Sequence, residues 1–424
     1  MSRRLWLAAI TLTTIITLTS IILLSTSKEP APQYSPPVNR TVSFGLLIGD
    51  KNDTARLEYA ARQAAAEVNE YCEAQGNQWS FRVVTLPASD PQQVIVGIQK
   101  LEGMGVKIFL CDWNTPICSF QTYIVLHNLT IIGVPESHCR SHKQVDSVYR
   151  MSPNLKEETE AFAALLRTKA VKALIVLKES GSTDYLNSIL PIQGFGVESV
   201  KEIVHDHTEA EPNEWKTRDA ERSKVFMDEV SSTLHDMLER YRPEEIGVVY
   251  AYSYFNENQL IEIGNHPELL QVIWYTTPLL VINQTQILAH SDVTTRIHLL
   301  TPVLAPDLEK NVEYNRLEEG YEVTQAYLAD PTPLGVTEAS LYDAVKVAAL
   351  SLIHSEATEG KTLQSTIMQE ASNYVGATGR MTLDENGDRI KSNFDIYGYY
   401  EVSGLPGWVR VGHYNSETEI TELY

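Results

Sequence analysis

The sequence predicts an α/β protein with two similar lobes, each a mostly parallel, doubly wound sheet flanked by helices. Three observations favour this fold class. The chain has 424 residues, which exceeds the usual size of one domain. Short apolar runs alternate with amphipathic stretches of helical length, a pattern typical of βαβ units around a parallel sheet. The alternation restarts near residue 150, which indicates a second lobe.

The first series of strands and helices ends near residue 152. Its expected strands are residues 42–48, 81–85, 106–110 and 129–134. The helix after the first strand has one apolar face, which consists of Leu57, Ala61, Ala64, Val68 and Tyr71. Asp90 followed by Pro91 predicts the start of a second helix, since Asp caps a first turn and Pro fits within it.

The second series follows the same alternation. Its expected strands are residues 173–177, 246–250, 271–275 and 297–300. The polar stretch of residues 205–218 is interpreted as a loop insertion. A later helix begins near Glu338, and its inward face consists of Leu341, Val345, Ala348 and Leu352.

The composition excludes one large class of function. Acidic residues outnumber basic residues by 55 to 34, and the formal net charge is −21. Nucleic-acid binding needs basic patches that replace phosphate counterions, so this balance argues against it. Hydrophobic residues make up 43% of the chain, which is enough for folded cores.

The N-terminal residues indicate a location outside the cytoplasm. Arg3 and Arg4 precede an uncharged run, residues 5–26, that is long enough to span a bilayer. We interpret residues 1–27 as a cleaved signal peptide or a retained membrane anchor, and the Pro-rich residues 28–40 as an extended linker. Sequons that fit a cell-surface or periplasmic protein begin at Asn39, Asn52, Asn128 and Asn283.

The C-terminal part contains the most informative stretch. Residues 376–388 read GATGRMTLDENGD, and residues 393–402 read NFDIYGYYEV. The Asp/Asn/Gly segment between strand-forming runs predicts a tight turn, because Asn and Gly tolerate a positive φ. With the alternating strands and helices from about residue 42 to residue 413, this stretch resembles the type I branched-chain amino-acid-binding family. That family comprises extracytoplasmic solute-binding proteins of ABC transporters.

The resemblance implies a domain organisation and a set of partners. The chain would cross between the lobes three times, near Ser152, Thr301 and Ala377. Lobe 1 would then comprise residues 41–152 plus 302–376, and lobe 2 residues 153–301 plus 377–424. A monomer of this kind binds a small solute between its lobes, uses no cofactor, and delivers the solute to an ABC permease with its ATPase subunits.

Ligands of open α/β sheets bind beyond the carboxyl ends of the strands. In the resembled family, hydroxyl groups of the first lobe hold the carboxylate of an amino-acid ligand. In the second lobe, an aromatic ring covers the ligand and an acidic residue pairs with its ammonium group. Ser137 matches a hydroxyl position and Tyr185 the aromatic one, but Asp112 stands where a Ser is expected. Thr276 or Thr277 replaces the acid that binds the ammonium group.

These departures bear on the ligand class. A desolvated carboxylate at Asp112 would repel a ligand carboxylate. An amide, a polyol or an amine that pairs with Asp112 is therefore as compatible with the sequence as an α-amino acid. Further expected ligand-binding residues in the same loops are Trp113, Asn114, Glu136, Asp184, Tyr252 and Thr277. Each has a structural alternative, since loop Asp residues often cap helices and aromatic rings often only pack.

The cysteines admit two interpretations. Cys111, Cys118 and Cys139 lie in adjacent strand-end loops, and outside the cytoplasm they predict a disulfide, Cys118–Cys139 or Cys111–Cys139. A zinc site is the alternative, with ligands drawn from Cys111, Cys118, His138, Cys139 and His142. Residues 384–388 superficially resemble a calcium loop. Asn393 stands where the bidentate Glu would be, which favours a hairpin turn.

The sequence lacks the motifs of common enzymes. It contains no nucleophile elbow, phosphate loop, HExxH or dinucleotide fingerprint. Binding without chemistry is therefore favoured over an extracellular hydrolase. A membrane-anchored sensor domain of the same fold is the alternative to the transport function.

Overall fold

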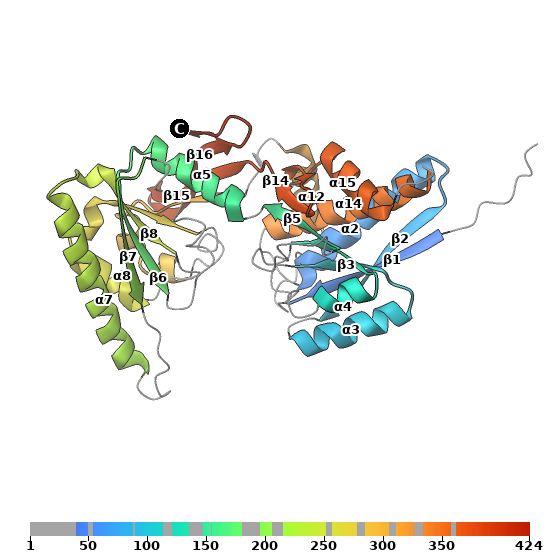
Figure 1. Ribbon diagram of the computed structural model, residues 1–424, viewed down its shortest axis with the longest axis horizontal. Helices are drawn as coiled ribbons and strands as arrows, with labels where there is room; N and C mark the ends of the chain where they lie inside the picture. Colours follow the sequence, from blue (N-terminus) through green and yellow to red (C-terminus); the bar gives the residue numbers. More distant parts are fainter. Residues whose placement is uncertain are drawn as a thin grey trace, which may run out of the picture.

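The computed structural model describes residues 40–49, 54–87, 90–112, 121–134, 147–153, 155–179, 196–205, 215–251, 257–277, 285–304, 311–324, 327, 334–357 and 362–424. Two mainly parallel sheets with helices on their faces form the architecture. Figure 1 shows the two sheets side by side, each with its own helices. The α/β class predicted from the sequence is confirmed.

The first sheet has seven strands, of which β13 alone runs antiparallel to its neighbour. In spatial order they are β13 (Thr382–Leu383), β14 (Asp388–Ile390), β5 (Val148–Pro153), β4 (Thr130–Gly133), β3 (Ile108–Cys111), β1 (Arg40–Ile48) and β2 (Trp79–Pro87). The central strands are short and almost wholly apolar, as is typical of parallel strands that are covered on both faces. The two-residue strands β11 (Val375–Gly376) and β12 (Gly379–Arg380) pair separately.

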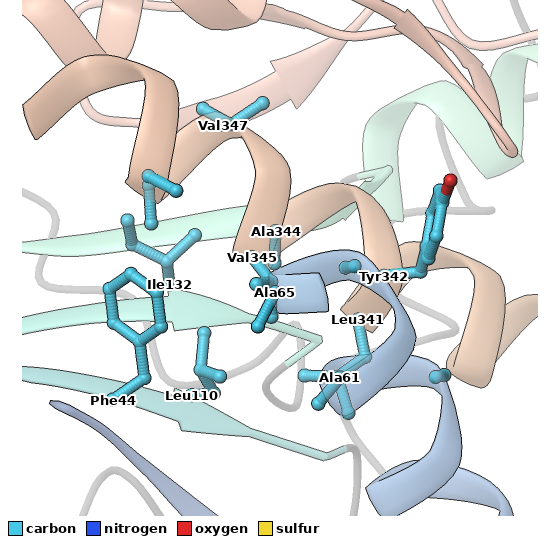
Figure 2. Packing of buried hydrophobic residues seen from close by; sticks show 14 of the residues in the cluster. Phe44, Ala61, Ala65, Leu110, Ile132, Leu341, Tyr342, Ala344, Val345 and Val347 are labelled. Atoms are coloured by element: carbon cyan, nitrogen blue, oxygen red, sulfur yellow. The ribbon is translucent and has the colours of Figure 1, made fainter. Parts of the chain in front are cut away.

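Helices cover both faces of the first sheet. They are α2 (Thr54–Ala74), α3 (Pro91–Gly103), α4 (Gln121–Leu126), α12 (Val312–Glu322), α14 (Val336–Ala357) and α15 (Leu363–Asn373). One core contains α2 and α14, and Figure 2 shows Ala61 and Ala65 of α2 close to Leu341 and Val345 of α14. Small alanine side chains let these helices approach closely. The other core contains α3 and α4.

The predicted face of α2 needs one correction. Leu57, Ala61, Ala64 and Val68 are buried, but Tyr71 is 45% exposed. Tyr71 lies in the last turn of the helix, where Cys72 is the buried residue. The predicted start of α3 is confirmed, because the Asp90 side chain accepts hydrogen bonds from the backbone nitrogens of Gln92 and Gln93.

The second sheet has eight strands. In spatial order they are β17 (Ile420–Leu423), β16 (Leu405–Asn415), β15 (Phe394–Val402), β10 (Leu300–Leu304), β9 (Ile273–Thr276), β8 (Ile246–Tyr250), β6 (Ala173–Glu179) and β7 (Ser199–His205). Strands β6 to β10 are parallel, and the three C-terminal strands extend the sheet in antiparallel fashion.

Helices also cover both faces of the second sheet. They are α5 (Leu155–Thr168), α7 (Trp215–Leu238), α8 (Glu257–Asn265), α10 (Thr285–Ala289) and α11 (Ser291–Thr294), with the short 3-10 helices η4 (Pro243–Glu245) and η5 (Leu269–Gln271). Helix α5 packs on one face, and α7, α8, α10 and α11 pack on the other. We call this sheet with its helices the second body, and the first sheet with its helices the first body.

Three connections join the two bodies, and all of them link the carboxyl ends of parallel strands. The first leads from the end of β5 into α5, and the second from the end of β10 toward α12. The third leads from β14, which is parallel to β5, into β15, whose first residue Phe394 lies opposite Leu304 at the end of β10. The carboxyl ends of both sheets therefore lie where the chain passes between the bodies.

The third connection differs from the expected position near Ala377. Strands β13 and β14 belong to the first sheet, so the chain passes to the second body only at residues 391–393. Residues 377–390, which the sequence assigns to lobe 2, are held in the first body by β14. The Arg389 guanidinium donates to the carbonyl oxygen of Met151 on β5, at 3.1 Å.

The hairpin turn predicted for residues 384–388 is confirmed. The Asp384 carboxylate accepts hydrogen bonds from the backbone nitrogens of Asn386, at 2.9 Å, and Asp388, at 3.0 Å. Gly387 has a φ of 79°, which favours glycine. The carboxylate at the head of this segment thus binds backbone amides of the turn.

The described residues contain no helix that is both long and apolar enough to cross a membrane. The expected N-terminal segment, residues 1–27, lies outside them, and so does nearly all of the Pro-rich linker.

Candidate functional site

The site expected from the sequence lies at the carboxyl ends of the two sheets. Two of its nine expected residues, Asp112 in the first body and Thr277 in the second, are described. The other seven lie outside the described residues: Trp113, Asn114, Glu136, Ser137, Asp184, Tyr185 and Tyr252. The geometry of the site is therefore built from the strand ends.

Asp112 follows β3 directly and is almost fully buried, with 1% exposure. Both of its carboxylate oxygens lie within hydrogen-bond distance of the Gly49 backbone nitrogen, at 3.1 and 2.9 Å. Gly49 follows β1, which pairs with β3. The side chain thus joins the ends of two neighbouring strands, a structural role that differs from the helix cap considered above.

A row of neighbouring residues continues from the end of β3 across the first sheet and leads to a buried ion pair. Cys111, Gly133, Arg150 and Asp388 are successive partners on β3, β4, β5 and β14. The Arg150 guanidinium pairs with the Asp388 carboxylate at 3.1 Å, and both side chains are nearly buried. A Cβ on Gly133 would lie 2.4 Å from the Cys111 carbonyl oxygen, so glycine lets these strand ends approach.

Cys111 is a free thiol, and its side chain is fully buried. Burial raises its pKa well above the usual value, and the Asp112 carboxylate raises it further, whereas Arg150 opposes the shift. The expected pairing of Cys111 with Cys139 is therefore not formed, because the Cys111 side chain points into the core beneath the strand end. Cys118 and Cys139 lie outside the described residues.

The zinc alternative draws most of its ligands from the same undescribed segments. His138 and His142 lie there, as do Cys118 and Cys139. Among the described residues, no group of three or more His, Cys, Asp or Glu side chains could hold a metal ion.

The corresponding edge of the second sheet carries two threonines. The Thr276 hydroxyl donates to the Tyr250 carbonyl oxygen at 3.3 Å and so bridges β9 and β8. Thr277 comes immediately after β9 and is buried to 7% exposure. Of the two threonines considered for the position of the ammonium-binding acid, Thr276 uses its hydroxyl within the sheet.

A carboxylate at this edge was missed by the sequence interpretation. Asp395 on β15 lies opposite Val303, near the carboxyl end of β10, and is 1% exposed. Its Oδ1 atom binds Arg410 and His413, each at 2.9 Å. Its buried Oδ2 atom has no hydrogen-bond partner among the described residues. An Asp between the apolar Phe394 and Ile396 of a predicted strand is the signal that would have revealed it.

A second buried polar cluster holds residues 377 and 378 against α14 within the first body. The Asp343 carboxylate on α14 accepts hydrogen bonds from the backbone nitrogens of Ala377 and Thr378 and from the Thr378 hydroxyl, at 2.7–2.8 Å. Arg389 donates to the same hydroxyl at 2.8 Å. Burial raises the pKa of Asp343, although these bonds oppose the shift, and burial lowers the pKa of Arg389 to about 10.

No protein-family model matches the chain, and no curated protein matches it. Any assignment of function therefore depends on the fold, the strand-end residues and the resemblance described above.

Proposed function

We propose that the protein is the extracytoplasmic solute-binding component of an ABC-type importer. Its fold would be that of type I solute-binding proteins. One observation carries the proposal: three connections join the carboxyl ends of two α/β sheets. Because ligands of such sheets bind at those ends, a solute there would touch both bodies. Closure would stabilise whatever contacts both, which links binding to a change of shape.

The proposed solute is small and polar, such as an amino acid, an amide or an amine. The buried carboxylates of Asp112 and Asp395, one at each edge, favour a ligand with N–H donors. Ser137 and Tyr185, which lie outside the described residues, are further proposed contacts. The closed form would dock on a membrane permease with its ATPase subunits, and the protein would act as a monomer.

The alternative is a membrane-anchored ligand-sensing domain, which the uncharged run of residues 5–26 favours. Neighbouring genes for a permease and an ATPase would support the importer. Neighbouring genes for signalling proteins would support the sensor.

A thermal-shift screen across amino acids, amides, amines and polyols tests solute binding. A true ligand at about 100 times its Kd stabilises the protein by about 2.7 kcal/mol and so raises Tm. Leucine-type amino acids should give little shift, since Asp112 replaces the expected Ser. Tight leucine binding would contradict that specificity, and no shift from any class would defeat the proposal.

Ser137→Ala tests the residue that best matches the family pattern. The variant should weaken binding of the solute found in the screen and leave the Tm of the solute-free protein nearly unchanged. Ser80→Ala, at the start of the edge strand β2, is the matched control and should alter neither quantity. A large loss of solute-free stability in Ser137→Ala would make Ser137 structural.

A further inference from the structure

The third connection, residues 391–393, is held by a side chain that follows the first connection. Glu157 lies in the first turn of α5. Its Oε2 atom accepts hydrogen bonds from the backbone nitrogens of Lys391, at 2.9 Å, and Ser392, at 3.3 Å. One carboxylate oxygen therefore joins two of the three connections.

The backbone of the third connection needs such a partner. Lys391 has a φ of 58°, a left-handed conformation that residues with a Cβ rarely adopt. Ser392 is 1% exposed, so its amide must find an acceptor within the protein. Burial raises the pKa of Glu157, and its hydrogen bonds with the two amides oppose that shift by favouring the ionised form.

Further contacts join β5 and β14, the strands of the first body from which the first and third connections begin. Arg150 of β5 pairs with Asp388 of β14 at 3.1 Å. Arg389 donates to the carbonyl oxygen of Met151 at 3.1 Å. The two strands are thus joined just before the chain leaves the first sheet, and Glu157 joins their continuations just after it.

We infer that Glu157 is a positioning residue that makes the first and third connections bend as one hinge. It would thereby limit the angles that the two bodies adopt in the absence of solute. The inference rests on the proposed function, in which the bodies close on a solute. A protein that is restricted to few open angles loses less conformational freedom when it closes, so affinity depends on a residue that never touches the solute.

Three substitutions separate this role from a general contribution to folding. Glu157→Ala removes the acceptor. Glu157→Gln keeps a carbonyl oxygen that can accept both amides. Glu160→Ala is the control on the same helix, because Glu160 forms only a surface pair with Lys156 at 3.5 Å among the ion pairs of the described residues.

Two measurements on the solute-free protein test whether Glu157 restricts the hinge. Hydrogen exchange reports the amides of Lys391 and Ser392, and exchange there should rise about tenfold or more in Glu157→Ala, with little change elsewhere. Spin labels at Lys100 of α3 and Lys224 of α7, attached by cysteine-independent chemistry, report the distance between the bodies. The distance distribution should broaden in Glu157→Ala and stay narrow in Glu157→Gln and Glu160→Ala.

Several outcomes would overturn the inference. They are an unchanged distance distribution in Glu157→Ala, a Glu157→Gln variant as broad as Glu157→Ala, or faster exchange spread evenly over the protein. If Glu157→Ala does not fold, Glu157→Asp replaces it, since that substitution withdraws the carboxylate by one methylene. The distance distribution of Glu157→Asp should be broader than that of the wild type, and a narrow distribution would contradict the inference. Failure of the solute screen would defeat the proposed function without changing these solute-free measurements.

Discussion

The Asp112 carboxylate binds the Gly49 amide with both oxygens, at 3.1 and 2.9 Å, and so fixes the end of β1 to the end of β3. A solute is proposed to bind beyond the ends of these two strands. The residue that was expected to contact the ligand therefore also holds the strand ends that position the site.

Substitution of Asp112 should cost stability as well as binding. Asp112→Ala leaves the partly buried Gly49 amide without its carboxylate acceptor, which should lower the free energy of unfolding by about 1–3 kcal/mol. Asp112→Asn keeps one acceptor oxygen and should cost less. Urea unfolding measures the stability of both variants. Equal stability of Asp112→Ala and the wild type would show that the bond contributes nothing.

Asp343 should be among the most sensitive positions in the chain. Asp343→Ala would leave the amides of Ala377 and Thr378 without an acceptor and would remove the carboxylate that most favours the charged form of Arg389. Removing one partner of a buried charged cluster typically costs about 3–5 kcal/mol. Chemical denaturation should show this loss, and a smaller one for Asp343→Asn.

The control for Asp343 is Asp236→Ala on the exposed face of α7. A surface substitution of this kind usually changes stability by less than about 0.5 kcal/mol. A loss in Asp343→Ala as small as that of the control would contradict the importance of the cluster.

Local patterns in the sequence predicted the individual elements well. The apolar run of residues 246–250 coincides with β8, and the cap at Asp90 forms as expected because it depends only on neighbouring residues. The Asp/Asn/Gly turn before β14 also depends on local backbone preferences. Strand boundaries elsewhere shifted by a few residues, as for β10, which begins at Leu300 where the expected strand ends. The expected loop of residues 205–218 was wrong at its end, because α7 begins at Trp215.

Relationships between distant residues could not be read from the sequence. The third connection lies at residues 391–393 and not near Ala377. Asp388 and Arg389 are bonded to residues of β5 that are 238 positions away in the sequence, and this holds them in the first body. Asp395 stands out locally as an Asp within an apolar strand, but its partners Arg410 and His413 come from the neighbouring strand β16 and could not be read from that pattern. Local periodicity carries no information about such pairs.

Cys111 should be unreactive in the folded protein. Its thiol is fully buried, and burial raises its pKa well above the usual value, so little thiolate is present for alkylation. Peptide mapping after iodoacetamide treatment should find Cys111 unmodified in the native state and modified in urea. A disulfide-linked Cys111 peptide would contradict the free thiol.

Glu245 should control part of the stability in acid. Its Oε1 atom pairs with Lys172 at 2.7 Å and Arg242 at 3.2 Å, and Oε2 accepts from the Arg242 backbone nitrogen at 3.0 Å. Hydrogen bonds from Arg242 and Lys172 lower its pKa from 4.5 to about 2. The folded protein thus holds the proton less tightly than the unfolded chain, so stability falls as pH falls through this range.

The measurement is Tm between pH 7 and pH 2 for the wild type, Glu245→Gln and the control Glu244→Gln, which alters the exposed neighbour that pairs with Arg242. Glu245→Gln should lower Tm at pH 7 and should lose less Tm than the wild type as the pH falls from about 4.5 to about 2. Glu244→Gln should keep the steep decline of the wild type. Parallel curves for Glu245→Gln and the wild type would mean that Glu245 titrates alike in the folded and unfolded states, and the pairing with Lys172 and Arg242 would then contribute nothing to acid stability.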